Sequence, residues 1–276
     1  MAYTLNSVNF TIYGIIPGRV AGGNVAVEGN FNLPARIGKT FHEWGDEDGI
    51  QAYTDASEIF FGGRDIKFEG FLIGNNSTCF ANLKSFTDAC DAVTGTQTFA
   101  TPYGNYNVLV KSVVPTHYYG ATKITVNFRE PVVDISGGTL PGTGASDWQI
   151  DGIPFTSFGL YPSSKTGMTA LPEYKPQSFT KYGMEGFQPT KRKNKILTIQ
   201  GFVIGSGLVD FQSKIKALYL IFSSTGTRQI KLNNELYVTC FADTGFMVSE
   251  LHYADNGIIA KFKIDLKVTA FSLTSF

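Results

Sequence analysis

Hydrophobic and polar residues alternate in several stretches of the chain, and two other stretches carry an apolar stripe at helical spacing. Ile66 and Phe68 alternate with Lys67 and Glu69, and residues 261–268 repeat this alternation near the end of the chain. Such alternation predicts strands with one buried face. The stripe in 208–222 predicts a helix with one apolar side, formed by Leu208, Phe211, Ile215, Leu218 and Phe222.

A second, weaker stripe predicts a helix that follows Gly74. Ser77 or Thr78 is placed to cap its first turn, because a hydroxyl can accept a hydrogen bond from the free amide groups there. The residues expected on its apolar face are Phe80, Leu83, Phe86 and Cys90. Gly95 and Gly226 follow the two helical stripes and predict a left-handed stop after each.

These patterns occur twice along the chain and in the same order. Residues 3–15 match 148–160 in their aromatic, apolar and glycine positions, and 68–74 match 199–205. A Leu-Pro pair, a Phe and an aromatic-Gly pair recur at identical spacing in 33–45 and 171–183. Shared order and spacing predict a tandem duplication. The expected modules are 1–134 and 148–276, joined by a Gly- and Ser-rich linker at 135–147.

Composition agrees with a strand-rich fold. The chain has 23 Phe, 13 Tyr and 30 Gly, residue types that suit half-buried pleated surfaces and the turns between them. The fold class expected is therefore mainly β, with one α-helix in each module. The long segment 20–63 has a polar middle, and we expect it to form a projecting hairpin or arm that becomes ordered on assembly.

Charge and cysteine content narrow the possible partners. Lys plus Arg equals Asp plus Glu at 23 each, so no overall field attracts nucleic acid or an anionic membrane. A charged fraction of only 17% suggests a surface covered by partners. We expect the sparse cysteines to be reduced and buried, and the N-terminus carries no secretory pattern. No apolar stretch is long enough to span a bilayer, so we expect folding in a cytoplasm.

The sequence offers no catalytic or cofactor-binding constellation. His42 stands near acidic residues, but Asp46-Glu47-Asp48-Gly49 lacks the later ligands of a calcium loop. No nucleophile elbow, zinc-type helix or phosphate loop accompanies the remaining histidines or glycines. We therefore expect no enzyme, no cofactor and no metal.

The matching regions of the two modules differ in charge. The first module carries an acidic loop of Glu43, Asp46, Glu47 and Asp48. The second carries a basic segment with Lys181, Lys191, Arg192, Lys193 and Lys195. Each taken singly is interpreted as a solvated loop. Taken together they form the candidate assembly contacts, in which the acidic loop of one copy faces the basic segment of another and fixes order in an assembly.

The order strand, Gly-x-x-x-Gly turn, amphipathic helix, Gly-Thr and strand pair resembles the ring domain of phage distal tail (Dit) proteins. It is also similar to tail-tube and baseplate-hub domains, over most of each module and centred on 70–110 and 201–240. The resemblance implies two tandem β-sandwich or barrel domains of tail-tube type. The second module departs from the usual distal tail pattern, in which an unrelated carbohydrate-binding-like domain follows the ring domain.

The resemblance also implies partners and a location. The chain would form a homo-oligomeric ring, either a trimer with pseudo-six-fold symmetry or a hexamer, in the tail of a virion. Its neighbours would be the tail tube and the tail-tip or hub proteins, and DNA would only pass through the lumen. The alternative from the residues is a tandem carbohydrate-binding, lectin-like module in which Trp44, Trp148 and tyrosines stack on sugars. An enzyme built from distant residues ranks third.

Overall fold

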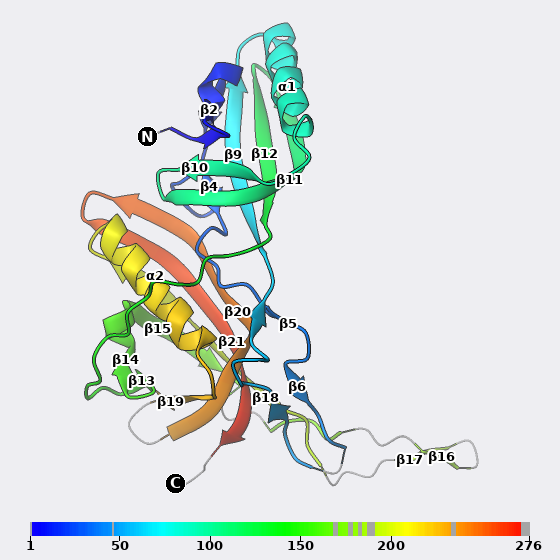
Figure 1. Ribbon diagram of the computed structural model, residues 1–276, viewed down its shortest axis with the longest axis vertical. Helices are drawn as coiled ribbons and strands as arrows, with labels where there is room; N and C mark the ends of the chain where they lie inside the picture. The colour runs from blue at the N-terminus through cyan, green and yellow to red at the C-terminus, as the bar shows by residue number, and fades with distance from the viewer. Residues whose placement is uncertain are drawn as a thin grey trace.

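Two large antiparallel sheets, each with one helix, make up most of the molecule in the computed structural model (Figure 1). The structure describes residues 2–45, 47–167, 171–175, 179–181, 184–186, 191–232 and 236–271. The predicted fold class, mainly β with one helix in each half, is confirmed.

The first sheet has eight strands and the order β2-β1-β10-β11-β12-β9-β3, with β4 also paired to β9. Its strands are β1 (Thr4–Leu5), β2 (Val8–Asn9), β3 (Ile15–Pro17), β4 (Val27–Glu28), β9 (Arg64–Ile73), β10 (Gln97–Thr101), β11 (Gly104–Tyr118) and β12 (Ala121–Glu130). Helix α1 (Asn76–Asp91) covers the apolar face, where Phe68, Phe99 and Phe128 pack together.

The second sheet has seven strands in the order β14-β13-β19-β20-β21-β18-β15. Its strands are β13 (Trp148–Ile150), β14 (Ile153–Pro154), β15 (Leu160–Thr166), β18 (Lys195–Gly205), β19 (Arg228–Leu232), β20 (Leu236–Ala254) and β21 (Gly257–Phe271). Helix α2 (Leu208–Ser223) lies on its apolar face.

Short strands outside the two sheets pair with each other. They are β5 (Arg36–Ile37) with β8 (Phe60–Phe61), β6 (Phe41–His42) with β7 (Gln51–Ala52), and β16 (Phe179–Lys181) with β17 (Met184–Gly186). Short 3-10 helices, η1 (Phe10–Tyr13) and η2 (Phe155–Phe158), follow β2 and β14. Residues 135–147 run without regular structure between the sheets, and Ile135 packs against the second core.

The predicted stripe of α2 is confirmed, since Phe211, Ile215, Leu218 and Phe222 are all buried. Helix α1 begins earlier than predicted. Asn75 is its cap and accepts a hydrogen bond from the Thr78 amide, so the prediction of Ser77 or Thr78 is wrong.

Two further details of the helices differ from expectation. Cys79 rather than Phe80 faces the core of the first half, and Phe80 is 54% exposed. Gly95 does not have a positive φ, because α1 ends at Asp91 and the right-handed Ala92. Gly226, with φ +80°, is the left-handed residue predicted after α2.

The three cysteines, Cys79, Cys90 and Cys240, are buried and unpaired, as predicted. Cys79 and Cys90 lie on the same helix. Burial raises the pKa of the Cys90 thiol to about 11, which keeps that group protonated at neutral pH.

Candidate functional site: the junction between the halves and the charged loops

The segment that follows β3 does not project from the first half; it packs on the second. We call residues 18–63 the first arm. Its side chains Val20, Val25, Phe31 and Leu33 are buried in the core of the second half. Phe31 packs edge-on against Phe211 of α2, with ring centroids 5.2 Å apart. The expectation of a projecting arm is therefore wrong for this part, because its apolar residues find a core within the same chain.

The first arm pairs with the part of β20 that has β21 on one side and no strand of the second sheet on the other. Strand β19 pairs only with residues 236–240 of β20. Beyond that point Leu33 forms an antiparallel bridge with Phe246, through amide-to-carbonyl bonds of 3.0 and 3.2 Å. The Asn24 amide donates to the Leu251 carbonyl at 3.0 Å, and the Asn24 side chain bonds both backbone groups of Tyr253. The arm thus occupies the open edge of the second sheet.

Strand β20 bends to receive the arm. Its register with β21 shifts between Ala242 and Phe246 and again between Ser249 and His252. At Gly245 φ is +69°, and a Cβ there would lie 2.1 Å from the Leu33 carbonyl oxygen. Only glycine fits a left-handed position so close to another backbone.

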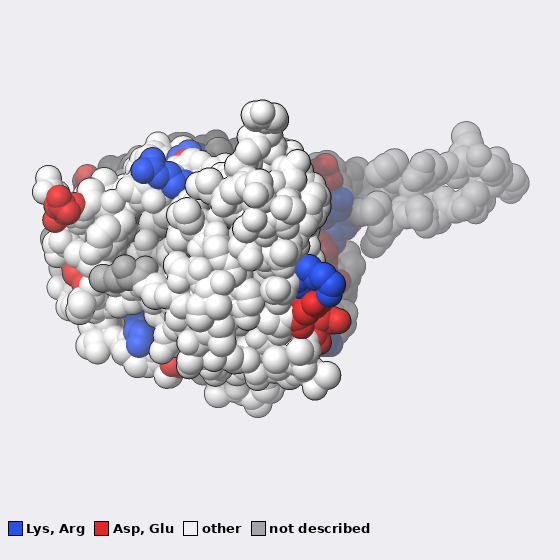
Figure 2. All heavy atoms as spheres, turned by 90° about the horizontal axis from the view of Figure 1, so that it is seen from above, with Lys and Arg blue, Asp and Glu red and all other residues white. Residues whose placement is uncertain are grey.

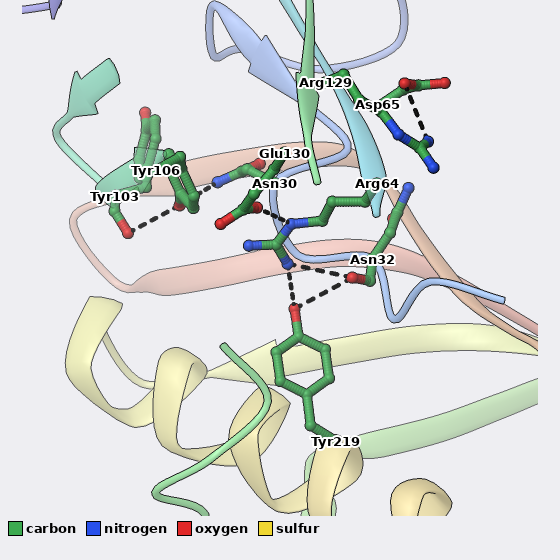
Figure 3. Close-up of polar contacts among 9 residues, drawn as sticks. All are labelled: Asn30, Asn32, Arg64, Asp65, Tyr103, Tyr106, Arg129, Glu130 and Tyr219. Atoms are coloured by element: carbon green, nitrogen blue, oxygen red, sulfur yellow. Dashed lines mark hydrogen bonds and ion pairs between the residues drawn. The ribbon is translucent and has the colours of Figure 1, made fainter. Parts of the chain in front are cut away.

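A buried polar network joins the halves beside this edge (Figure 3). Arg64, at the start of β9, donates from Nε to Glu130 Oε2 at 2.6 Å, and both side chains are 7% exposed. Its Nη1 donates to the Asn32 carbonyl at 3.1 Å and to the Tyr219 hydroxyl of α2 at 2.8 Å. Burial raises the pKa of Glu130, against the opposing effect of Arg64, and raises that of Tyr219 to about 12.

A second group of contacts continues the network. The Asn30 side chain donates to the Tyr106 hydroxyl at 2.9 Å, and that hydroxyl donates to the Tyr103 carbonyl at 3.2 Å. The same carbonyl accepts a 2.7 Å bond from Gln212 of α2. Since these buried groups are hydrogen-bonded to one another, the network fixes how α2 lies against the first half.

The acidic loop and the basic segment meet within one chain. Lys175 Nζ is buried and donates to the carbonyls of Trp44, Glu47 and Gly49 at 2.5, 2.7 and 3.0 Å. Glu43 lies 3.8 Å from the same ammonium. These contacts close the loop around one lysine that the sequence reasoning did not single out.

Asp48 makes the direct link between the two sequence-predicted groups. Its carboxylate accepts a 2.7 Å bond from the Arg192 amide, and the Gly49 amide donates to the Arg192 carbonyl at 3.2 Å. The Arg192 guanidinium lies over the Tyr174 ring, 4.1 Å from its centroid. The loop and the segment therefore lie side by side within one chain, and their role in an assembly stays a prediction.

The other candidate contacts are more scattered. Lys193 pairs with Glu173 at 2.8 Å on the surface, and the Lys191 carbonyl accepts a hydrogen bond from the Lys175 amide. Lys195 begins β18, and burial lowers its pKa. Lys181 ends β16, and Asp46 lies outside the described residues.

The end of the first half that carries the β11–β12 turn is nearly free of charge. Figure 2 looks onto this end, where Lys, Arg, Asp and Glu lie at the rim. Its exposed apolar side chains are Ile12, Ile73, Phe80, Tyr118 and Tyr119. A surface of this kind is typical of contacts with other proteins.

The tryptophans of the carbohydrate-binding alternative do not form matching platforms. Trp44 is partly exposed, and its indole nitrogen donates to Gln51 while its ring meets His42. Trp148 packs against Phe155 and the second core. No observation therefore favours paired sugar sites in the two halves.

Among the described residues, no cluster of His, Cys, Asp and Glu is placed to hold a metal ion. In the same part of the chain, none of the helices combines the length and apolar character needed to cross a membrane.

Comparison with known proteins finds likeness in structure but none in sequence. No protein-family model matches the sequence, and no curated protein matches it. The solved structure of the Dit protein (gp 19.1) of phage SPP1, described as a paradigm of the hub adsorption apparatus in phages that infect Gram-positive bacteria, is similar at 12% identity and a TM-score of 0.34. The similarity covers 96% of this chain and 98% of that protein. At this identity and TM-score the likeness assigns neither a family nor a function to this chain.

Proposed function

We propose that this chain is a structural, non-enzymatic component of a phage or phage-like tail. In this proposal it is a distal tail or baseplate-hub ring protein that connects the tail tube to the tip and leaves a channel for DNA. The observation that carries the proposal is that one chain holds two sheets of the same strand order. Each strand of β2-β1-β10-β11-β12-β9-β3 has a counterpart in β14-β13-β19-β20-β21-β18-β15.

Small features of the two halves support the proposed duplication at 1–134 and 148–276. The 3-10 helices η1 and η2 end at Gly14 and Gly159, with φ of 69° and 68°. Asn6 and Asp151, which begin the tight turns before them, share a positive φ of 49° and 50°. Such strained turns at matching places are more simply inherited by both halves than acquired twice.

Open sheet edges support assembly into a ring. Strand β15, of seven residues, pairs with β18 alone among the described strands, so its other side is an open edge. Exposed edges of this length promote association with other chains. Closure into a ring satisfies every edge, whereas a pairing that does not close gives filaments.

The charge balance suits a channel through which DNA passes. With 23 basic and 23 acidic residues, the chain has no net charge to retain a polyanion. A protein whose lumen bound DNA tightly would slow its ejection.

Native mass spectrometry together with negative-stain microscopy of the purified protein tests the proposal. A chain of 30.1 kDa gives about 90 kDa for a trimer and about 181 kDa for a hexamer. A six-lobed ring at the lower mass supports a trimer with pseudo-six-fold symmetry, and a ring at the higher mass supports a hexamer with two modules in each subunit. A monomer at all concentrations, together with binding to a glycan array, would refute the proposal in favour of the carbohydrate-binding alternative.

A further inference from the structure

The first sheet has an open edge at the place where the second sheet receives the first arm. Strand β10 pairs with residues 104–108 of β11, and residues 109–118 have no strand on that side in the described part of the chain. Pro115 lies in this stretch and pairs with Ile124 on the β12 side, as is typical of a proline in an edge strand. None of the described strands therefore occupies this edge of β11.

The register of the two sheets shows which residues correspond. Counted from the matched glycines Gly70 and Gly201, the pairings of β9–β12–β11 and of β18–β21–β20 place Val113 where the second sheet has Phe246. Phe246 is the residue that bridges to Leu33 of the first arm. Val113 is thus the position at which an equivalent arm would pair with β11.

The second half carries the equivalent of that arm residue, exposed to solvent. Leu33-Pro34 and Leu171-Pro172 are the matched Leu-Pro pairs of the two halves. Leu33 is 2% exposed because it is buried against the second sheet, whereas Leu171 is 74% exposed. The leucine of the first half is therefore buried within the chain, and the matching leucine of the second half is exposed.

The helices show the same asymmetry. Phe80 and Gln212 are each the fifth residue of a 16-residue helix. Gln212 reaches the Tyr103 carbonyl of the first half at 2.7 Å, whereas Phe80 is exposed and its ring lies 5.1 Å from that of His117 on β11. The first half covers one face of α2, whereas the corresponding face of α1 is exposed to solvent.

From these matched positions we propose that the contact between the halves of one chain is repeated between chains. The second half of one copy docks on the first half of the next, with Leu171 lying opposite Val113 on the open edge of β11. The occupant of this edge is a second copy of this chain, because Leu171-Pro172 matches the Leu33-Pro34 pair that covers the corresponding edge of the second sheet, and Leu171 is exposed. The contact is head-to-tail, so its repetition gives a closed ring when the rotation closes. This inference rests on the proposed function in that both require self-assembly.

Crosslinking of cysteine variants tests the pairing directly, and the buried native cysteines give little background. Leu171→Cys and Val113→Cys in one chain should give a ladder of covalent oligomers under mild oxidation, because each copy links to two neighbours. A mixture of the two single variants should stop at dimers, and each single variant alone should stay uncrosslinked. Dimers from Leu171→Cys alone would indicate a symmetric contact and would overturn the proposal.

A surface charge tests the energetics of the same contact. Leu171→Asp should raise the apparent dissociation constant of the assembly at least tenfold and leave the melting temperature unchanged, because Leu171 is exposed in the single chain. Val209→Asp is the matched control, since Val209 is 81% exposed but lies in the first turn of α2, outside the proposed contact. Sedimentation velocity measures the dissociation constant of each variant.

The outcomes separate this inference from the proposed function. If Leu171→Asp still forms rings and the double cysteine variant gives no covalent oligomers, the docking of the second half on β11 is overturned, but the proposed ring protein is not. A parent chain that stays monomeric at every concentration overturns the docking of the second half on β11, and it overturns the ring protein as well when the chain also binds a glycan array.

Discussion

Loss of the Arg64 guanidinium should reveal how strongly the two halves of the chain depend on each other. Arg64→Met leaves the Glu130 carboxylate buried without its charged partner and removes the donor to Tyr219 and to the Asn32 carbonyl. Breaking a buried ion pair in this way costs about 3–5 kcal/mol. Because whole proteins are stable by only about 5–15 kcal/mol, this one change should remove a large part of the stability.

The matched control lies nearby on the same sheet. Arg129 pairs with Asp65 at 3.2 Å, but their side chains are 39% and 59% exposed. An exposed pair contributes about 0–1 kcal/mol, so Arg129→Met should be nearly silent. The two variants remove the same kind of side chain and differ mainly in burial.

Urea unfolding followed by circular dichroism measures both effects. Tyr219→Phe, which removes one bond to a charged group, should cost about 1.5–3 kcal/mol and serves if Arg64→Met does not fold. Replacing both partners, as Arg64→Met with Glu130→Leu, should recover most of the loss, since no buried charge is then left alone. If Arg64→Met costs no more than Arg129→Met, the junction is not held by this network and the reasoning is refuted.

Three further changes test other parts of the fold. Burial opposes ionisation of Glu69, but its ion pairs with two lysines outweigh burial and hold its pKa below 4.5. The contribution of Glu69 to the free energy of unfolding is therefore present above about pH 4.5 and is lost as the pH falls below that value. Glu69→Gln should make the urea midpoint of unfolding depend less on pH in this acidic range. Phe211→Asp should unfold the second half, at a cost above about 4 kcal/mol, because that ring is fully buried; normal near-ultraviolet dichroism would show the packing to be wrong. Reversing the charges of Asp46, Glu47 and Asp48 should weaken assembly more than it lowers the melting temperature, and assembly that is unchanged and insensitive to salt would count against a role for the loop.

The sequence predicted those features that depend on near neighbours. The stripe of Phe211, Ile215 and Leu218 repeats at the helical period, so the face of α2 that meets the core could be read from spacing alone. The same was true of β21, whose alternation at 261–268 marks one buried face, and of β9 except at Glu69, which is buried between two lysines. Repeated spacing also indicated that the halves would look alike.

Features that depend on distant partners escaped prediction. The first arm looked polar and unsupported because its apolar residues, among them Leu33, pack on a strand more than 200 residues away, as the 216-residue separation of Asn32 and Val248 illustrates. Arg64 and Lys175 are ordinary charged residues in the sequence, and only the fold surrounds them with acceptors. The acidic and basic loops were noticed through their charge, but that they meet inside one chain has no local signal.

Because the first arm packs on the second half, it cannot reach its final position until most of the chain has been synthesised. Asn32 and the Val248 amide that it bonds are 216 residues apart. At about 5–20 residues per second, the ribosome needs roughly 10 to 40 seconds to make the second half after the arm has emerged. During that interval the arm's buried side chains, Phe31 and Leu33, have no surface to cover them. The nascent chain therefore exposes an apolar, unpaired segment. Until the C-terminal strands are made, this segment can bind a chaperone or pair with a finished neighbouring chain instead of packing on its own second half.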